Sequence, residues 1–220
     1  PNDFLLSPYV LKCYLCQSND INKHIDIVVQ QYGYIPPSRI EEEAESILCD
    51  IEETQPDIVG FSCYVWNMDA IRLISSKLKQ MHENTIVILG GPEIAAEDIV
   101  SGVFDKYAVD YFIFGEGELP LLALLNFQTL RRSEDEIKNI KGLAYKKGGK
   151  VYCNVEAEVL ENIDQLPSPY LEGYISDEVL TRDGIRANIE TQRGCNFKCA
   201  YCFYHKNFSV IRYRDADVVV

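Results

Sequence analysis

The stretch DIVGFS, which runs from Asp57 to Ser62, predicts a buried β-strand. Its side chains are almost continuously apolar, and this pattern is typical of a strand that is covered on both faces. The stretches TIVIL at Thr85–Leu89 and DYFIF at Asp110–Phe114 have the same character. The chain therefore contains short buried strands of the kind found in parallel sheets.

Helical patterns precede and separate these strands. Ser38–Glu41 (SRIE) has the form of a capping box and predicts the start of a helix. The apolar face of this helix comprises Ile40, Ala44, Ile47, Leu48 and Ile51. A second helix is expected from about Asn67 to His82, and its apolar face comprises Ile71, Ile74, Leu78 and Met81. Strands that alternate with such helices form a parallel sheet, so we predict a doubly wound α/β domain over residues 1–130.

The remainder of this domain follows the same alternation. Phe4–Leu15 predicts a helix, and Ile25–Gln31, which is rich in β-branched residues, predicts a strand. A fold of this kind normally opens with a buried strand before its first helix, so we expect that strand to be missing from this sequence. A short helix is expected through Ile99 and Val103, and a nearly all-apolar helix at Leu119–Leu125.

The character of the sequence changes at Arg131. Gly142–Tyr145 and Val151–Asn154 are joined by a Gly-Gly turn and predict a hairpin. Leu160–Pro169 contains two prolines and predicts an extended linker, and Ile185–Thr191 predicts a new strand. We therefore expect three regions: the α/β domain at 1–130, a hairpin and linker at 131–181, and the start of a second domain at 182–220.

Composition and charge restrict the function. The chain has 220 residues, no run of about 18 apolar residues that could span a membrane, and no secretion signal at its N-terminus, so we expect a cytoplasmic protein. Its net charge of −13 argues against a general nucleic-acid binder, which needs a basic face. The segment Arg182–Arg214 nevertheless carries +5, which leaves −18 for the other residues. Such a basic segment suits an anionic cluster or ligand, and a solvated surface would explain it equally well.

Three of the eight cysteines lie close together, at Cys195, Cys199 and Cys202. Thiolate sulfur is the usual ligand of a 4Fe-4S cluster, which ordinarily takes four cysteines. A loop with three cysteines can hold three irons and leave the fourth open to a substrate, as catalytic zinc sites keep an open position. The alternative is a structural zinc site, without catalysis, that adds His205 to the three thiolates.

The pattern C-x3-C-x-aromatic-C, in which Tyr201 is the aromatic residue, resembles the signature of radical S-adenosylmethionine enzymes. The resemblance implies that Cys195, Cys199 and Cys202 bind a 4Fe-4S cluster whose open iron chelates S-adenosylmethionine, and that backbone near Tyr201 meets the adenine. It also implies that an electron, supplied by a reductant such as flavodoxin or ferredoxin, cleaves the sulfonium and releases a 5′-deoxyadenosyl radical. The (β/α) barrel of this family needs several strands beyond Val220. We therefore expect these 220 residues to hold a truncated barrel and to be catalytically incomplete.

Small residues stand at the carboxyl ends of the predicted strands, at Ser62, Gly90, Gly91, Gly115 and Gly117. In an open parallel sheet, ligands bind in the crevice beyond these ends. Glycine there lets a large planar ligand approach the backbone closely. Turn geometry alone also explains glycine at such positions.

An α/β domain followed by a linker and this cysteine motif resembles the cobalamin-binding class of radical S-adenosylmethionine enzymes. The resemblance rests on Val59–Ser62, Ile88–Pro92 and Gly115–Glu118 and covers essentially the whole chain. It implies a flavodoxin-like, cobalamin-binding fold, and methyl transfer to, or cyclisation of, a small-molecule or modified substrate. The implied cofactor-binding residues are Ser62, Gly90 and Gly91 in the pocket and Gly115, Glu116 and Gly117 near its rim.

The sequence departs from a related group of cobalamin domains in one respect. The motif D-x-H-x-x-G, which supplies a lower axial ligand in methionine-synthase-type domains, is absent, and neither His24 nor His82 has its context. Cobalamin could therefore bind without a protein histidine. Alternatively, the domain has lost cobalamin and serves substrate recognition, as in methylthiotransferase-like relatives.

Other residues have both a structural and a functional interpretation. Cys13 and Cys16 form a C-x2-C pair or one helical turn of buried small residues. Cys63 faces the predicted pocket or is buried in the core. Tyr64 and Trp66 pack on a corrin or cover the core of the domain itself.

Overall fold

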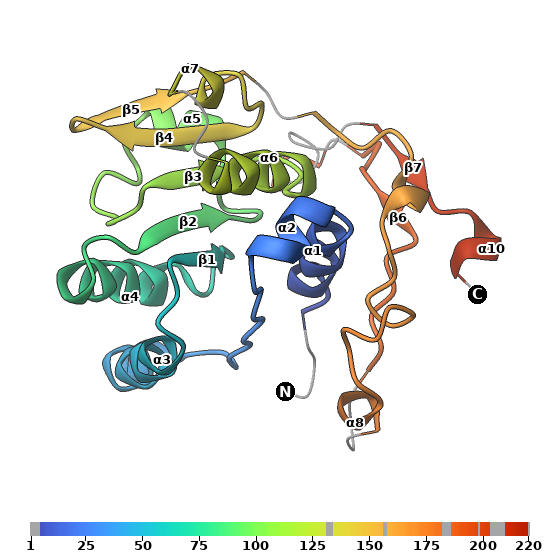
Figure 1. Ribbon diagram of the computed structural model, residues 1–220, viewed down its shortest axis with the longest axis horizontal. Coiled ribbons are helices and arrows are strands. Elements are labelled where there is room, and N and C mark those ends of the chain that lie inside the picture. Colours follow the sequence, from blue (N-terminus) through green and yellow to red (C-terminus); the bar gives the residue numbers. More distant parts are fainter. Residues whose placement is uncertain are drawn as a thin grey trace. The chain divides into compact units, whose positions relative to one another are not determined.

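The computed structural model describes residues 5–130, 134–155, 158–181, 186–197, 199–202 and 210–219 (Figure 1). The chain divides into two compact units, each described by itself. The sheet unit comprises Gly33–Leu121 and Ser133–Glu158. The loop unit comprises Pro1–Tyr32, Leu122–Arg132 and Val159–Val220.

A five-stranded sheet with the order β1-β2-β3-β4-β5 forms the centre of the sheet unit (Figure 1). β1 (Ile58–Ser62), β2 (Ile86–Gly90) and β3 (Tyr111–Ile113) are parallel, so the predicted α/β fold with parallel strands is confirmed. β1 is less buried than the sequence predicts, and its Gly60 is exposed. The reason is that, among the described residues, β1 pairs with β2 alone.

The predicted hairpin is formed by β4 (Leu143–Lys147) and β5 (Lys150–Cys153). It extends the same sheet, because β4 pairs with β3 in the antiparallel sense. The sheet is therefore mixed, and it continues past the boundary expected at residue 130. The alternating residues of a hairpin predict its two strands, but they do not predict which other strand of the sheet pairs with the hairpin.

The helices described in the sheet unit are α3 (Ile40–Thr54), α4 (Met68–Met81), α5 (Ala96–Val100) and α7 (Glu134–Ile137). α6 (Glu118–Thr129) contributes its first turn to the sheet unit and the rest to the loop unit. α3 and α4 lie side by side (Figure 1). Their predicted apolar faces are buried at Ala44, Ile47, Leu48, Ile51, Ile71, Ile74 and Leu78. Met81, which the helical spacing also places on the buried face, is instead 46% exposed. The short helix expected through Val103 ends at Val100, and Val103 is 57% exposed.

The capping box predicted at Ser38–Glu41 is not formed. Ser38 lies inside a 3-10 turn, η1 (Pro37–Arg39), and α3 begins after it without a side-chain cap. Arg39 instead pairs with two carboxylates of the first helical turn, Glu42 at 3.2 Å and Glu43 at 2.7 Å. Acidic side chains in this turn are also favoured by the helix dipole.

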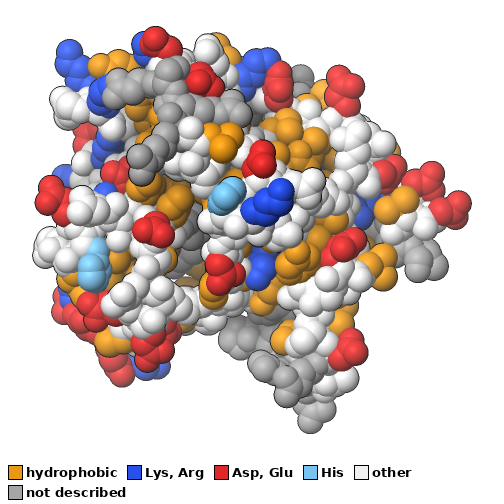
Figure 2. Space-filling model, viewed as in Figure 1, with side chains coloured by type: hydrophobic (Ala, Val, Ile, Leu, Met, Phe, Trp, Pro, Cys, Tyr) orange, Lys and Arg blue, Asp and Glu red, His pale blue; other side chains and the backbone are white. Residues whose placement is uncertain are grey.

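The outer face of α3 concentrates negative charge. Figure 2 shows Asp and Glu side chains gathered over this helix, which carries Glu41, Glu42, Glu43, Glu45, Asp50, Glu52 and Glu53. Lys77 of α4 pairs with Glu45, and His82 lies 3.5 Å from Glu52. Part of the negative charge that the sequence places outside Arg182–Arg214 is therefore found here.

The described elements of the loop unit are α1 (Ser7–Cys16), α2 (Asn19–His24), η2 (Ile163–Gln165), α8 (Asp177–Leu180), β6 (Gln192–Arg193), β7 (Arg212–Tyr213) and α10 (Ala216–Val219). β6 and β7 form an antiparallel pair. In neither unit does a described helix have the length and apolar character needed to cross a membrane.

Two strands predicted in the loop unit are not formed in its described part. Ile25–Gln31 makes no strand, although most of its side chains alternate between half-buried and exposed. In the segment Ile185–Thr191, Ile185 lies outside the described residues and the rest forms no strand, since pairing begins only at Gln192. β-branched residues favour strands only where a neighbouring strand is present, which explains both errors.

The predicted linker is packed rather than exposed. Leu160, Ile163 and Leu166 are 7%, 0% and 1% exposed. Burial of each of these apolar side chains stabilises the fold by about 1.5–3 kcal/mol, so packing holds the segment in place.

Candidate functional site

The register of the sheet brings the predicted small residues to one edge. Ser62 is paired with Gly90, and Gly90 with Ile113, so the carboxyl ends of three neighbouring parallel strands are level. Gly115 follows two residues later with a φ of 79°, a value that favours glycine. We call this region, comprising residues 62–67, 90–94 and 114–118, the carboxyl edge.

Backbone hydrogen bonds fix the first two loops of the carboxyl edge to each other. The Cys63 amide donates to the Gly90 carbonyl at 2.6 Å, and the Glu93 amide donates to the Cys63 carbonyl at 3.3 Å. The Ile94 amide closes a turn by donating to the Gly91 carbonyl at 3.0 Å. These loops are therefore held in place before any ligand binds.

The two adjacent glycines serve different purposes. Gly91 has a φ of 111°, and a Cβ there would lie 2.8 Å from the Cys63 backbone, so the turn itself requires glycine. A Cβ on Gly90 would meet only Ile113, at an ordinary 3.7 Å. The fold does not require glycine at position 90. The absence of a side chain there leaves space at the carboxyl edge.

Asn67 organises the loop after β1, a role that sequence analysis missed. Its side-chain nitrogen Nδ2 donates to the Ser62 carbonyl at 2.9 Å, and its side-chain oxygen Oδ1 accepts from the Tyr64 backbone amide at 2.8 Å. The only available signal was the position of Asn67 at the expected start of a helix. The side chain therefore ties the strand end to the turn that carries Tyr64 and Trp66.

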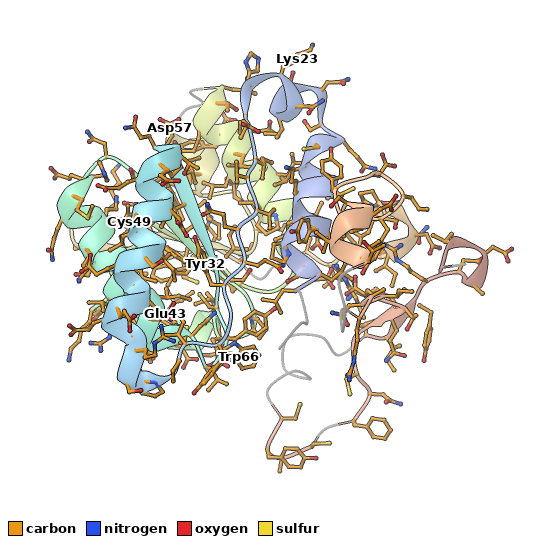
Figure 3. The ribbon with its side chains drawn as sticks, turned by 90° about the horizontal axis from the view of Figure 1, so that it is seen from below. Lys23, Tyr32, Glu43, Cys49, Asp57 and Trp66 are labelled. Carbon is orange, nitrogen blue, oxygen red and sulfur yellow. The ribbon has the colours of Figure 1, made fainter. Side chains whose placement is uncertain are left out.

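This turn presents aromatic surface. The rings of Tyr64 and Trp66 stack with centroids 4.7 Å apart and planes inclined by 10°. Trp66 is 53% exposed, so it does not serve to cover the core. Figure 3 shows Trp66 at the opposite end of β1 from Asp57.

Cys63 faces the core and not the predicted pocket. Its side chain is fully buried among the apolar residues of the sheet unit, and burial raises the pKa of its thiol to about 12. The thiol is therefore neutral at physiological pH. Because thiolates are the metal-binding form of cysteine, Cys63 is a poor candidate for a metal ligand.

The acidic residues at the third strand end are also buried. Glu116 is 6% exposed and Glu118, in the first turn of α6, is 4% exposed. His82 lies at the C-terminal end of α4, away from the carboxyl edge, and His24 ends α2 in the other unit. The described part of the sheet unit thus places no histidine at its carboxyl edge.

The cysteine loop, residues 194–211, is closed at its base by β6 and β7. Gly194 has a φ of 91°, and a Cβ there would lie 2.0 Å from the Val210 carbonyl oxygen. The backbones of the two ends of the loop therefore touch, and only glycine permits this approach. Sequence analysis missed Gly194, although its position directly before Cys195 was a signal.

The three cysteines are free thiols and half-exposed. The Cys195 thiol donates to the Phe197 carbonyl at 3.8 Å, and the Cys202 amide donates to the Cys199 carbonyl at 3.0 Å. Within the described residues no three cysteine, histidine or acidic side chains are gathered closely enough to hold a metal. The loop supplies suitable donor atoms without gathering them, and His205 of the zinc alternative lies outside the described residues.

Cys13 fits the structural interpretation of the C-x2-C pair. It is 2% exposed, and burial raises the pKa of its thiol to about 11. A hydrogen bond with the Cys16 side chain, together with burial of the phenol, raises the pKa of Tyr174 to about 12. Cys13 and Tyr174 are therefore neutral packing groups in the loop unit.

Comparison with known families identifies the part of the chain that contains β1, β2 and β3. Residues 24–125 match the family described as "B12 binding domain". These residues form a B12-binding domain. The carboxyl edge, with Ser62, Gly90, Gly91 and Gly115–Glu118, lies inside the matched range.

Two curated relatives of the chain are named as methyltransferases, and one of the two names also mentions cobalamin. "Cobalamin-dependent radical SAM methyltransferase TokK" from Streptomyces tokunonensis is 30% identical over 168 residues, which is 74% of this chain and 23% of the relative. "2-(S-pantetheinyl)-carbapenam-3-carboxylate methyltransferase" from Streptantibioticus cattleyicolor is 32% identical over 172 residues, 74% of this chain and 24% of the relative. The chain thus spans about a quarter of the length of these relatives.

A solved structure supports the fold. "Cobalamin-dependent S-adenosylmethionine radical enzyme OxsB with aqua-cobalamin bound" matches with a TM-score of 0.68 and 21% identity, covering 98% of this chain and 28% of OxsB. The B12-binding domain of this chain therefore has the flavodoxin-like fold that the sequence pattern predicts.

Proposed function

We propose that the B12-binding domain binds cobalamin at its carboxyl edge, and that the cysteine loop holds a 4Fe-4S cluster and S-adenosylmethionine. The chain would be the N-terminal part of a cytoplasmic radical S-adenosylmethionine enzyme that uses cobalamin. Its reaction would be methyl transfer to, or cyclisation of, a small-molecule or modified substrate, with electrons from flavodoxin or ferredoxin. The observation that carries the proposal is the space at Gly90, inside the matched family range, which the fold itself does not require.

The residues of the carboxyl edge fit a large planar ligand. Ser62, Gly90 and Gly91 are half-buried and small, so a macrocycle can reach the backbone there. The exposed ring of Trp66 offers an apolar face of the size that packs on a corrin. Bound cobalamin supplies a cobalt centre able to carry a methyl group. The described residues of the carboxyl edge include no histidine, and its Cys63 is buried and neutral, so neither a histidine nor this cysteine would bind the cobalt there.

The cysteine loop supplies the thiol ligands that an iron–sulfur cluster needs, although the three sulfur atoms do not lie together at one site in the structure. Three thiols from one short loop leave one iron of a four-iron cluster without a protein ligand, and a bound cluster supplies an electron to S-adenosylmethionine at that iron. Metal binding and local folding are coupled in many small sites, so ligands that gather only around the metal are expected. Tyr201, which is 93% exposed, remains available for the adenine.

The test is the metal content of the full-length protein, purified without oxygen from cells supplied with hydroxocobalamin. We expect about four irons and four sulfides together with one cobalt per chain. The same iron without cobalt would show a radical enzyme whose B12-binding domain has another use, such as substrate recognition. One zinc without sulfide would contradict the enzyme function and favour the structural zinc site.

A further inference from the structure

The base of the cysteine loop is hydrogen-bonded to the packed segment 160–166. A guanidinium nitrogen of Arg212 donates to the Leu160 carbonyl at 2.6 Å, and one of Arg214 donates to the Leu166 carbonyl at 2.7 Å. The Asp215 amide donates to the Asp164 carboxylate at 2.9 Å. We call these three hydrogen bonds the arginine latch. They join residues that are 48 to 52 positions apart in the chain.

The latch is placed where hydrogen bonds are strong. Arg212 is 8% exposed, and its acceptor residue Leu160 is 7% exposed. A hydrogen bond from a charged donor in a water-poor site is stronger than one between neutral groups, and losing it leaves a buried polar atom unsatisfied. Arg212 and Arg214 are two residues apart on an extended strand, so both side chains leave the same face toward segment 160–166.

The same strand forms the base of the cysteine loop. Arg212 is paired with Arg193 in the β6–β7 register, and the Arg214 amide donates to the Thr191 carbonyl at 2.9 Å. Arg193 in turn makes a two-pronged ion pair with Glu190, at 2.9 and 3.0 Å. Cys195 follows Arg193 by two residues, and Gly194 between them touches the backbone of Val210. A shift of β7 would therefore move the first cysteine.

These contacts change the interpretation of the basic segment. The sequence leaves two explanations for its charge, an anionic ligand or a solvated surface. The guanidinium groups of Arg212 and Arg214 instead face backbone carbonyls of their own unit. Their task is therefore to hold strand β7.

We propose that Arg212 and Arg214 are positioning residues for the iron–sulfur site. They touch neither the cluster nor the substrate. They fix β7 to segment 160–166, and β7 fixes the point at which the chain enters the cysteine loop. The proposal rests on the proposed function of this loop as a cluster site.

The experiment measures how fast iron leaves the reduced cluster of the full-length, anaerobically purified protein when a strong iron chelator is added. Arg212→Ala should accelerate release about tenfold, the size of effect that outer-shell changes have at metal sites. Arg212→Lys keeps a charged donor and should restore a rate close to the unmodified one. Arg214→Ala and then Asp164→Ala should have smaller effects, because those residues are less buried.

Two control variants separate positioning from general loss of stability. Arg186→Ala removes the same charge from an exposed side chain of the basic segment. Ile163→Val removes a buried methylene group from segment 160–166 and leaves the latch hydrogen bonds in place. Both should release iron at the unmodified rate. Circular dichroism at the assay temperature checks that each variant is folded. If Arg212→Ala does not fold, Asp164→Ala still tests the latch, because it changes only one partly exposed contact.

The outcomes are distinct. Release from Arg212→Ala and Asp164→Ala at the rate of Arg186→Ala would overturn the latch. Equal acceleration by Ile163→Val, with no rescue by Arg212→Lys, would also overturn it, because the effect would then follow stability alone. A protein without an iron–sulfur cluster before any substitution would contradict the proposed function itself.

Discussion

The carboxyl edge of the sheet and the cysteine loop are organised in opposite ways. At the carboxyl edge, the Cys63–Gly90 hydrogen bond, the Asn67 side chain and the Gly91 turn fix the backbone before any ligand is present. In the cysteine loop the base is fixed, by β6, β7 and Gly194, but the three sulfur atoms are not gathered.

The difference follows from the ligands that each region is proposed to hold. A corrin is a rigid body that needs a surface of fixed shape, and a preformed surface reduces the entropy lost on binding. A cluster forms covalent bonds to its thiolates, and these bonds are strong enough to order a loop around it. The predictions below test this contrast.

The largest effect is expected in the cysteine loop. Replacing Cys195, Cys199 or Cys202 by alanine should abolish nearly all bound iron and sulfide, because a cluster held by two protein thiolates loses its anchoring. Iron and sulfide analysis of the anaerobic protein measures this. Cys49→Ala, which changes an exposed cysteine on α3, should retain the full content. Equal loss from Cys49→Ala, or retention in all three loop variants, would contradict the assignment.

The second prediction contrasts the two glycines of the carboxyl edge. Gly91→Ala should lower the free energy of unfolding by about 3 kcal/mol, because its φ of 111° is strained for alanine and its Cβ would meet the Cys63 backbone. Gly90→Ala should change the free energy of unfolding by less than about 1 kcal/mol. It should nevertheless weaken cobalamin binding about tenfold, since its methyl group fills the space left for the ligand.

The sequence itself supplies the probe for this comparison. Trp66 is the single tryptophan of the 220 residues and lies in the sheet unit, so its fluorescence during urea unfolding reports on that unit. Titration with hydroxocobalamin, followed by absorbance, gives the affinity. If both glycines respond alike, by losing stability or by losing cobalamin alone, the distinction between a turn glycine and a ligand glycine is wrong.

The sequence predicts those parts of the molecule that depend on local pattern. β1, β2 and β3 follow apolar runs that end in small residues, and the faces of α3 and α4 follow the helical period. The strand predicted at Ile25–Gln31 is wrong because strand propensity cannot supply the neighbour that a strand needs.

Within the candidate site, the same distinction holds. The spacing of Cys195, Cys199 and Cys202 is visible in the sequence, whereas Arg212 is not singled out by any motif. Its acceptor is a backbone carbonyl 52 residues away, and carbonyls are present at every position. The difference between Gly90 and Gly91 is equally invisible, because it depends on which atoms a Cβ would meet.

The third prediction uses the buried thiol of the carboxyl edge. Burial raises the pKa of Cys63 in the folded chain to about 12, from 9.0 for an exposed thiol. Between these values the unfolded chain loses the proton and the folded chain keeps it, so this group destabilises the fold as pH rises through that window. Its contribution falls by up to about 1.4 kcal/mol per pH unit above pH 9.

Comparison with Cys63→Ala isolates this contribution, since all other titrating groups are common to both proteins. The stability difference between the two, measured by Trp66 fluorescence at several pH values from 7 to about 10.5, should shift in favour of the alanine variant above pH 9. A difference that stays constant would mean that the Cys63 thiol is accessible to water. The preformed state of the carboxyl edge would then be in doubt.

The smallest effect is expected for the exposed aromatic stack. Trp66→Ala should weaken cobalamin binding about three- to tenfold, because one apolar ring face contributes about 0.5–1.5 kcal/mol beyond its area. It should cost little stability, since the ring is already 53% exposed and covers no core. Tyr152→Ala is the matched control: Tyr152 is 45% exposed and stacks on Tyr145 at 5.3 Å, but it lies on β5, at the far side of the sheet from β1. Equal loss of cobalamin affinity in both variants would mean that the effect is not specific to the carboxyl edge. Unchanged affinity in Trp66→Ala would restrict the binding surface to the glycine backbone, where the Gly90 variant already tests it.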